Sequence, residues 1–314
     1  MIDKQTMVLP NGCKSCHASS IAYLDGITFL TFFGGNYEGH RRTSIWLSTK
    51  KDNEDSWSEA VILCSGKDVL GFKRACWNPV IFLYQSEIFI YFKVGKSPQN
   101  WSGHCLLSKD KGKSWSGPHP LGNGIQGPTK NPPVVLNDRI LSGSSTELGA
   151  WNIHFEWSRN GRQWFASTSV DHSKIECIQP AILSRGNGKL TALARSEYGC
   201  LVSTQSADNG ESWRQIKRTD LINCNSGIAA LSVRPDLHVL ANNDSPTKRT
   251  PLILQVSRNT IDWTKGPIIE DGNGEFSYPS LCVANNQILC SYTQNRNSLG
   301  IAKLSIDTLE QTVV

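Results

Sequence analysis

Short apolar runs recur in pairs along this chain, and each pair brackets a turn of small or polar residues. Runs of this length, bounded by Gly, Asn or Asp, are typical of strands joined in a β-hairpin. Six pairs can be identified, with first runs starting at His17, Asn78, Asn131, Gln179, Gly227 and Tyr278. No helix pattern extends beyond one or two turns. The pattern predicts an all-β chain of six repeated units.

A second repeat, out of phase with the hairpins, is a short polar box that ends in tryptophan. The clearest copies are Ser108–Trp115 and Ser206–Trp213, which share Ser, Asp, Gly, Ser and Trp at fixed spacing. Divergent copies end at Trp164 and Trp263, and a degenerate one ends at Trp57. In such a box Asp or Asn folds back onto its own backbone and Gly takes a positive φ. We expect the tryptophan, in Trp115 and Trp213 above all, to be buried beneath the turn.

Strands and turns that repeat every 50 residues or so are the signature of a β-propeller. The repeat covers Cys16 to about Ile306, which leaves no room for a second module. Six hairpins and five boxes predict a single six-bladed β-propeller domain over residues 1–314, in which the last blade lacks a box.

Composition narrows the range of partners. The net charge of +5 is mild and lacks the dense basic stripe that nucleic-acid binding needs. No apolar run is long enough to span a membrane, and the first residues contain no apolar signal segment. We therefore expect no nucleic-acid or membrane partner and a cytoplasmic location, with secretion left open. The ten cysteines then default to reduced thiols that pack as small hydrophobes.

One short motif matches a covalent haem site. Cys13-Lys-Ser-Cys16-His17 has the C-x-x-C-H spacing of c-type haem attachment. That attachment requires an oxidising assembly route, and no leader is visible. His17 also falls at the start of the first hairpin. We therefore expect neither haem nor a metal, and no other cofactor is indicated.

The repeat also predicts where chemistry gathers. The inner strands of a propeller line its central channel, and ligands bind at one channel mouth. Residues at equivalent strand ends should therefore converge there. Hairpin starts give His17, Asn78, Lys130 with Asn131, Gln179, Ser226 and Tyr278, and second-strand ends give Glu38, Lys93, Glu147, Arg195, Asn242 and Arg296. Because His, Tyr, Asn, Gln and Arg are frequent in this set, we interpret it as a site rather than as solvated strand ends.

These features resemble the sialidase (neuraminidase) superfamily, which has six-bladed propellers with Asp boxes of this form. The chain is especially similar to divergent BNR-repeat, sialidase-like glycosyl hydrolases. Segments of that style include Phe33-Gly-Gly-Asn-Tyr-Glu38-Gly, Gly127-Pro-Thr-Lys-Asn-Pro and Ser277-Tyr-Pro. The boxes indicate the fold and say little about chemistry, since non-enzymatic propellers carry them too.

The resemblance implies a set of site residues. Sialidases hold the substrate carboxylate with three arginines, use a tyrosine nucleophile assisted by a glutamate, and use an aspartate as acid/base. Arg195 and Arg249 match the second and third arginines, and Tyr278 matches the nucleophile. Glu38 falls near the acid/base position. From their strand-end positions, we expect Lys130, Lys93, Asn78, Gln179 and Arg296 to line the substrate pocket as well.

Two positions depart from that pattern. His17 occupies the place of the first arginine, and Gln179 the place of the assisting glutamate. Glutamine cannot take a proton from a phenol. Either this route to a nucleophile is lost, or Glu147 or His17 takes over the task.

Three functions remain open at this point. The leading one is an exo-acting glycoside hydrolase that releases a terminal acidic sugar, sialic acid or a relative, from an acidic glycan. The second is a polysaccharide lyase on a uronate-containing glycan, with Tyr278 or His17 taking the C5 proton. The third is a carbohydrate-binding propeller without turnover.

Overall fold

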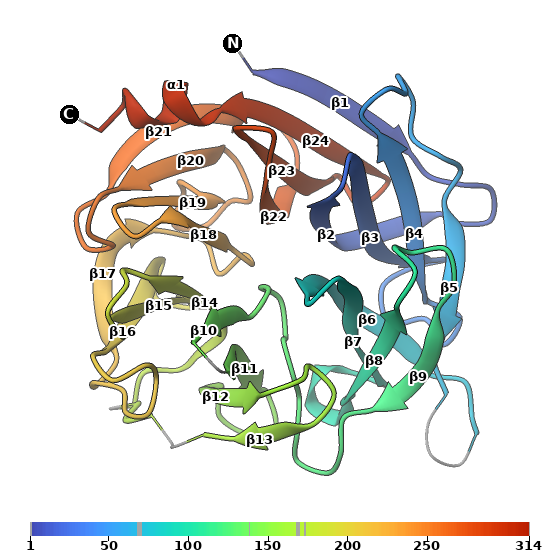
Figure 1. Ribbon diagram of the computed structural model, residues 1–314, viewed down its shortest axis with the longest axis horizontal. Helices are drawn as coiled ribbons and strands as arrows, with labels where there is room; N and C mark the ends of the chain where they lie inside the picture. The colour runs from blue at the N-terminus through green and yellow to red at the C-terminus, as the bar shows by residue number, and fades with distance from the viewer. Residues whose placement is uncertain (1, 68–70, 138, 168–169, 173, 314) are drawn as a thin grey trace.

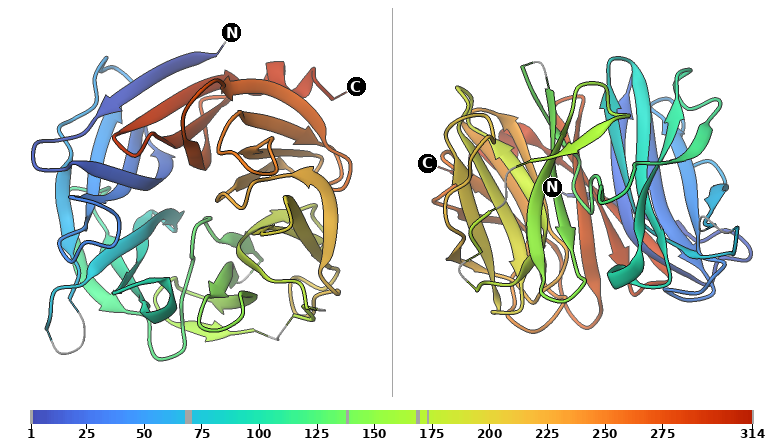
Figure 2. Two further views of the ribbon diagram at one scale, coloured as in Figure 1. Left: turned by 180° about the vertical axis from the view of Figure 1, so that it is seen from behind. Right: turned by 90° about the horizontal axis from the view of Figure 1, so that it is seen from below.

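The computed structural model describes residues 2–67, 71–137, 139–167, 170–172 and 174–313. Six four-stranded antiparallel sheets stand around a common axis like the blades of a propeller (Figure 1). Figure 2 shows the same ring from behind and edge-on, where the sheets lie side by side. The predicted all-β, six-bladed fold is confirmed.

Each of the first five blades is built from four strands that follow one another along the chain, from the axis outward. Blade 1 contains β2 (Ser15–Leu24), β3 (Ile27–Gly35), β4 (Ser44–Lys51) and β5 (Val61–Ser65). Blade 2 contains β6 (Ala75–Tyr84), β7 (Glu87–Gly95), β8 (Ser102–Ser108) and β9 (Ser116–Pro120), with a short 3₁₀ turn at Pro98–Asn100. Blade 3 contains β10 (Val134–Leu136), β11 (Arg139–Thr146), β12 (Asn152–Ser158) and β13 (Trp164–Ala166). Blade 4 contains β14 (Cys177–Ser184), β15 (Leu190–Ser196), β16 (Cys200–Ser206) and β17 (Lys217–Ile222). Blade 5 contains β18 (Ala229–Arg234), β19 (Leu237–Asn243), β20 (Leu252–Ser257) and β21 (Thr264–Glu270).

Blade 6 joins the two ends of the chain. Its first three strands are β22 (Phe276–Ala284), β23 (Gln287–Gln294) and β24 (Ser298–Ser305), and its outer strand is β1 (Asp3–Val8). Strand β1 pairs antiparallel with β24 along its whole length. Helix α1 (Ile306–Glu310) follows β24 at the point where the other blades carry a box. Among the described residues, no helix is long and apolar enough to cross a membrane.

Serine hydroxyls tie neighbouring inner strands together. The hydroxyl of Ser280 in blade 6 accepts the Ile21 amide of blade 1 at 3.2 Å, and Ser20 in turn accepts the Ile81 amide of blade 2 at 3.1 Å. Ser232 accepts the Ser184 amide at 2.9 Å between blades 5 and 4. The inner strands of adjacent blades do not share a ladder, so these hydroxyls satisfy amides that would otherwise be buried without a partner.

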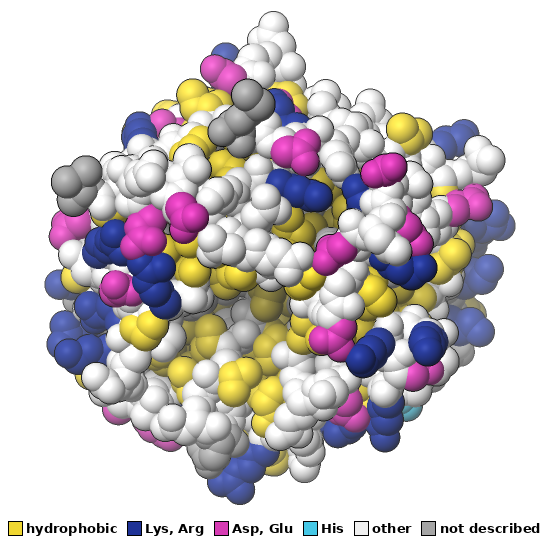
Figure 3. Space-filling model, turned by 45° about the horizontal axis from the view of Figure 1, so that its top comes forward, with side chains coloured by type: hydrophobic (Ala, Val, Ile, Leu, Met, Phe, Trp, Pro, Cys, Tyr) yellow, Lys and Arg dark blue, Asp and Glu magenta, His cyan; other side chains and the backbone are white. Residues whose placement is uncertain are grey.

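One face of the ring is hollowed at its centre (Figure 3). Hydrophobic side chains lie in the hollow, and charges of both signs lie close together around it.

Three ion pairs join the hairpin of one blade to the box of the next. They are Asp25–Lys111, Glu87–Arg162 and Arg139–Glu211.

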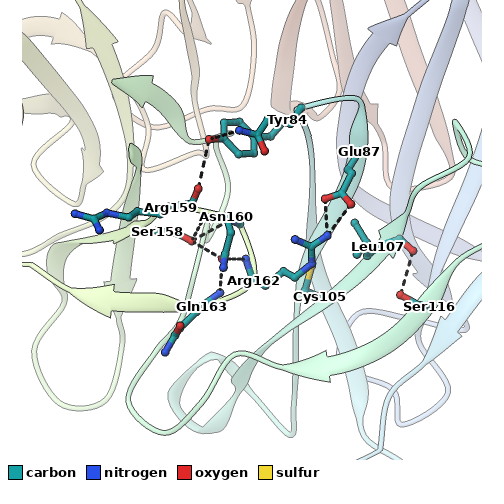
Figure 4. Close-up of polar contacts among 12 residues, drawn as sticks. Tyr84, Glu87, Cys105, Leu107, Ser116, Ser158, Arg159, Asn160, Arg162 and Gln163 are labelled. Atoms are coloured by element: carbon teal, nitrogen blue, oxygen red, sulfur yellow. Dashed lines mark hydrogen bonds and ion pairs between the residues drawn. The ribbon is translucent and has the colours of Figure 1, made fainter. Parts of the chain in front are cut away.

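The boxes are contacts between blades as well as local turns. In blade 3 the Ser158 hydroxyl accepts the amides of Asn160 and Gly161, which closes the turn shown in Figure 4. From blade 2, Tyr84 donates a hydrogen bond to the Arg159 carbonyl at 3.3 Å, and Glu87 accepts both hydrogen bonds from Arg162 (Figure 4). Each box therefore holds its own turn and also fixes the preceding blade.

The box glycine is needed for this contact. Gly112 has φ +84°, and a β-carbon placed on it would lie 2.6 Å from the Phe29 ring of blade 1. Gly210 is placed in the same way against Leu141 of blade 3. A side chain at these positions would have to displace the core of the neighbouring blade.

The expectation that Trp115 and Trp213 are buried is wrong. Both are half-buried, although Trp213 stacks on Phe155 with ring centroids 3.7 Å apart. Trp164 alone of these three is buried, and its indole N–H donates to the Gly161 carbonyl at 3.1 Å. Trp115 and Trp213 therefore keep part of their surface in solvent, whereas Trp164 does not.

We predict that Gly112→Ala lowers the free energy of unfolding by about 2–4 kcal/mol, because it adds a positive-φ penalty to an overpacked junction. Gly124→Ala is the matched control. Gly124 has φ +78°, and a β-carbon placed there would meet no atom within 4 Å, so this variant should lose only about 1–2 kcal/mol. Urea denaturation of both variants measures the difference. Equal losses would mean that the contact with Phe29 contributes nothing.

Candidate functional site

Four inner strands contain the same irregularity. Strands β2, β6, β14 and β22 each bulge by one residue against their partner strand. The first bulged residue has a positive φ in every case, and these residues are Ala18, Asn78, Gln179 and Tyr278. A bulge bends the strand and re-aims its side chains. This repeated distortion therefore defines the equivalent positions of the blades.

The bulges correct the predicted alignment of blade 1. His17 pairs with Phe33, just as Ser277 pairs with Thr293 in blade 6. The residue equivalent to Tyr278 is therefore Ala18, and His17 precedes it by one. His17 nevertheless reaches Tyr278, since its ring centroid lies 4.2 Å from that of the tyrosine.

Tyr278 is the centre of the candidate site. Besides His17, three cations lie over its ring, with Arg195 at 5.5 Å, Arg249 at 5.6 Å and Lys130 at 5.9 Å from the centroid. Blades 1 and 6 supply His17 and Tyr278, and the three cations come from the strand ends and connecting loops of blades 3, 4 and 5. Gly227 packs against the ring, and a β-carbon there would lie 3.1 Å from it.

The site is strongly electropositive. Burial, followed by the charges of Arg296, Arg249, Lys130 and Arg195, holds the pKa of His17 well below its usual value. The imidazole is therefore neutral at pH 7, and its Nδ1 lies 3.0 Å from the Thr293 hydroxyl. Burial, countered by Cys290 and reinforced by Arg195, lowers the pKa of Lys130 to about 7. An anion entering this pocket would offset that crowding.

A chain of ion pairs leads outward from Arg249. Its Nη1 contacts Glu275 Oε1 at 2.7 Å, Glu275 Oε2 contacts Arg296 Nε at 3.0 Å, and Arg296 contacts Glu38. Burial opposes ionisation of Glu275, but hydrogen bonds from Arg296, Ser277 and Arg249 outweigh it and lower its pKa. Arg296 also acts on His17, so this chain of ion pairs connects Glu38 to the candidate site.

Two of the cations have no carboxylate partner among the described residues. Lys130 donates to the Pro279 carbonyl at 2.6 Å, and Arg195 donates to the Asn225 carbonyl at 2.9 Å. The Nε of Arg195 is buried without a hydrogen-bond partner. Burial of such a donor carries a free-energy cost unless a ligand pairs with it.

The predicted helper, Glu147, is buried beside Arg195. Burial raises its pKa, and the charge of Arg195 opposes that rise in part. No hydrogen bond joins its carboxylate to Tyr278 among the contacts of the described residues.

Gln179 is buried, and its Oε1 has no hydrogen-bond partner. Asn78 donates to the Thr129 carbonyl at 3.2 Å and so supports the loop that carries Lys130.

The profile of the BNR repeat-like domain matches residues 27–290. The chain belongs to this family. No curated protein matches this chain. Among solved structures, a protein of unknown function from Dyadobacter fermentans superposes with a TM-score of 0.78 at 15% identity, covering 96% of this chain and 98% of that one.

Two sialidases share the fold of this BNR-repeat chain. Trypanosoma rangeli sialidase, in a covalent complex with 2,3-difluorosialic acid, gives a TM-score of 0.79 at 14% identity over 99% of this chain. A Hadza microbial sialidase gives 0.80 at 12% identity, covering 95% of this chain and 67% of that one. The chain spans 60% of the length of the Trypanosoma enzyme. At such low sequence identity, these superpositions show that the chain has a sialidase-like propeller fold.

Sequence reasoning missed Glu275, Trp151 and Thr293. Glu275 lies before the last hairpin and outside both repeats, and Trp151 places its ring 5.7 Å from the Arg195 guanidinium. The sequence signal for Glu275 is its position, because it lies in a polar loop three residues before Tyr278.

The Cys13–His17 motif is dispersed in the fold. The Cys13 thiol donates to the Ser15 carbonyl, the Cys16 thiol donates to the Ser298 carbonyl, and His17 faces Thr293. Across the described residues, no three His, Cys, Asp or Glu side chains gather closely enough to hold a metal ion.

Lys93 does not fit the predicted substrate-binding role. It is fully buried, and its Nζ donates to the Pro128 carbonyl at 2.6 Å. The nearby Glu156 is also fully buried and accepts the amides of Gln126 and Gly127. These two side chains hold the backbone of the loop that leads to Lys130.

We predict a pH dependence of stability from Lys93. Burial, only partly offset by Glu156, lowers its folded-state pKa to about 7, against about 10.4 in an unfolded chain. Between these values the unfolded state binds more protons, so stability rises with pH. Relative to Lys93→Met, the wild type should gain about 2 kcal/mol between pH 7 and pH 9 and change little below pH 6.5. Urea unfolding of both proteins across this range measures it. A difference that stays constant with pH would contradict the assignment.

Proposed function

We propose that this protein is an exo-acting glycoside hydrolase that releases a terminal acidic sugar, sialic acid or a relative, from a glycan. The observation that carries the proposal is the gathering of Lys130, Arg195 and Arg249 around one tyrosine. Two of these cations lack a carboxylate partner in the described part of the chain. Guanidinium groups bind a carboxylate through paired, charge-assisted hydrogen bonds, and this pocket offers such donors beside a potential nucleophile.

In the proposed reaction, the sugar carboxylate binds Arg195 and Arg249. The Tyr278 oxygen attacks the anomeric carbon as the bond to the leaving oxygen breaks, and an acid supplies the proton that this oxygen takes. Water then cleaves the tyrosyl–sugar bond and returns the tyrosine. Glu38 is the acid that the family resemblance supports, and it would have to exchange its contact with Arg296 for the leaving oxygen.

The tyrosine needs a base, because a phenol with an ordinary pKa near 10 is a weak nucleophile at neutral pH. Gln179 cannot serve. Glu147 is our candidate, since burial raises its pKa toward the range in which a carboxylate accepts and returns a proton. His17, neutral and in contact with the Tyr278 ring, is the other candidate.

We expect Tyr278→Phe to fold normally and to lose roughly 10³-fold or more in turnover, since it removes only the attacking oxygen. Tyr84→Phe is the control, because that hydroxyl contacts the Arg159 carbonyl at a box turn. Activity should be followed by mass spectrometry on a panel of acidic glycans. Near-normal turnover by Tyr278→Phe would make the tyrosine a binding residue and move the search to His17 and Glu38.

Replacing Arg195 or Arg249 with lysine keeps the charge and removes the planar fork. We expect affinity for an acidic sugar to fall at least about tenfold, with neutral sugars unaffected. Arg258→Lys, which changes an exposed ion pair with Glu310, is the matched control. Isothermal titration calorimetry measures the affinities. An unchanged affinity in both site variants would remove carboxylate binding from the proposal.

A second candidate is a lyase on a uronate-containing glycan. The observation that favours it is the neutral His17 ring against Tyr278, which offers a base beside the cations that would neutralise a C6 carboxylate. The base takes the C5 proton, the C4–O bond breaks, and a C4–C5 double bond forms. Lyase products lack the water that hydrolase products gain, so the same mass screen separates the two reactions. Glycan binding without products would indicate a carbohydrate-binding protein.

A further inference from the structure

A second cationic surface lies at the ends of the strands in blades 1 and 2. Two adjoining hollows of about 370 and 310 Å³ share Arg41 and Lys73 in their walls. The first hollow is also lined by Arg42 and Trp46, and the second by Lys96. We call this surface the blade-1 groove.

Among the described residues that line it, the blade-1 groove has positively charged side chains and no acidic one. No ion pair is formed by Arg41, Arg42, Lys73 or Lys96 with a carboxylate among the described residues. Arg41, Arg42 and Lys73 are all exposed. Two other exposed arginines are paired, Arg162 with Glu87 and Arg258 with Glu310, whereas Arg159 forms no ion pair with a described carboxylate. Unpaired cations that share one concave surface favour an anionic ligand.

Exposed aromatic rings flank the groove. Tyr37, next to the lining residue Asn36 in the chain, is 62% exposed, and Phe72, which lines the second hollow with Arg74 5.6 Å from its ring centroid, is 59% exposed. Large exposed rings beside polar groups mark interaction surfaces, because their apolar faces gain from being covered. The apolar face of a sugar ring is a suitable cover, while its charged groups reach the cations.

One loop connects this groove to the candidate site. Residues 36–43 join β3 to β4, and within this loop Glu38 contacts Arg296 at the outer end of the ion-pair chain from Arg249. Arg41 follows Glu38 by three residues, which places their backbones within about 10 Å of one another. A ligand of a few sugar units could therefore contact both regions.

We propose that the blade-1 groove is an extended subsite for an acidic oligosaccharide whose terminal acid occupies the Tyr278 site. This inference rests on the proposed function and deepens it. The substrate class becomes a glycan that carries negative charge on more than one residue. Arg41, Arg42 and Lys73 bind the anionic groups of the inner residues, and the rings of Tyr37 and Phe72 contact sugar faces.

The test compares the binding of oligomers and monomers to the intact protein. The probes are an oligomer of sialic acid and one of galacturonic acid, each paired with its monomer, and calorimetry at two salt concentrations gives the affinities. In Arg41→Gln/Arg42→Gln we expect about tenfold weaker binding of the preferred oligomer and a shallower salt dependence, because screening acts on exposed charges. Monomer affinity should not change. Lys109→Gln/Lys113→Gln removes the same charge from an exposed box turn and is the control.

The possible failures are distinguishable. Equal oligomer affinity in the groove variant and the control would overturn the groove. A groove-dependent oligomer affinity that is unchanged in Arg195→Lys would support an anionic glycan site in the groove and overturn its continuity with the Tyr278 site, together with the proposed function. Weakened monomer binding in the groove variant would also overturn it, because the groove would then belong to the central pocket.

Discussion

The pairing of β1 with β24 is the constraint on which the remaining structure depends. It joins residues about 300 positions apart in the chain and completes the sixth sheet. Only in a closed ring does Tyr278 of blade 6 meet His17 of blade 1. The box contacts continue around the closure, since Asn285 donates to Asp52. Contacts of such high sequence separation close a long loop and carry an entropic cost that the pairing must offset. The candidate site therefore requires the closed ring.

The pocket places positive charge around an aromatic ring, with little acid to balance it. Cation–π attraction offsets part of the repulsion between the cations. Burial, together with the charges of the neighbouring cations, keeps the pKa of His17 well below its usual value and lowers the pKa of Lys130 to about 7. Glu275 limits the imbalance by holding Arg249 from the outer side. Such a site favours an anion, because the free-energy cost of bringing the cations together is already met when the chain folds.

The repeats of the sequence predicted the blades because each hairpin and box is a local structure. They also predicted the strand ends that meet, so Arg195, Arg249 and Lys130 lie together around Tyr278, while their roles stay predictions. Blade 1 was misaligned because the bulge depends on a positive φ. Asn78, Gln179 and Tyr278 precede a proline, and Ala18 does not. The substrate-binding role predicted for Lys93 does not fit, because the direction in which a long side chain extends depends on the neighbouring loop. Charge balance by Glu275 is a tertiary property that no local pattern contains.

Buried thiols lie in the strands of blades 1, 2, 4 and 6. Each of these blades contains at least one buried strand thiol, among them Cys16, Cys105, Cys177 and Cys290, and burial raises the pKa of each of these four thiols. A thiol of this kind reacts slowly with alkylating agents until its surroundings open. The alkylation rate of its buried thiol would therefore report how readily each of these blades opens. The order in which these thiols become alkylated would trace how the ring comes apart, blade by blade, without any engineered label.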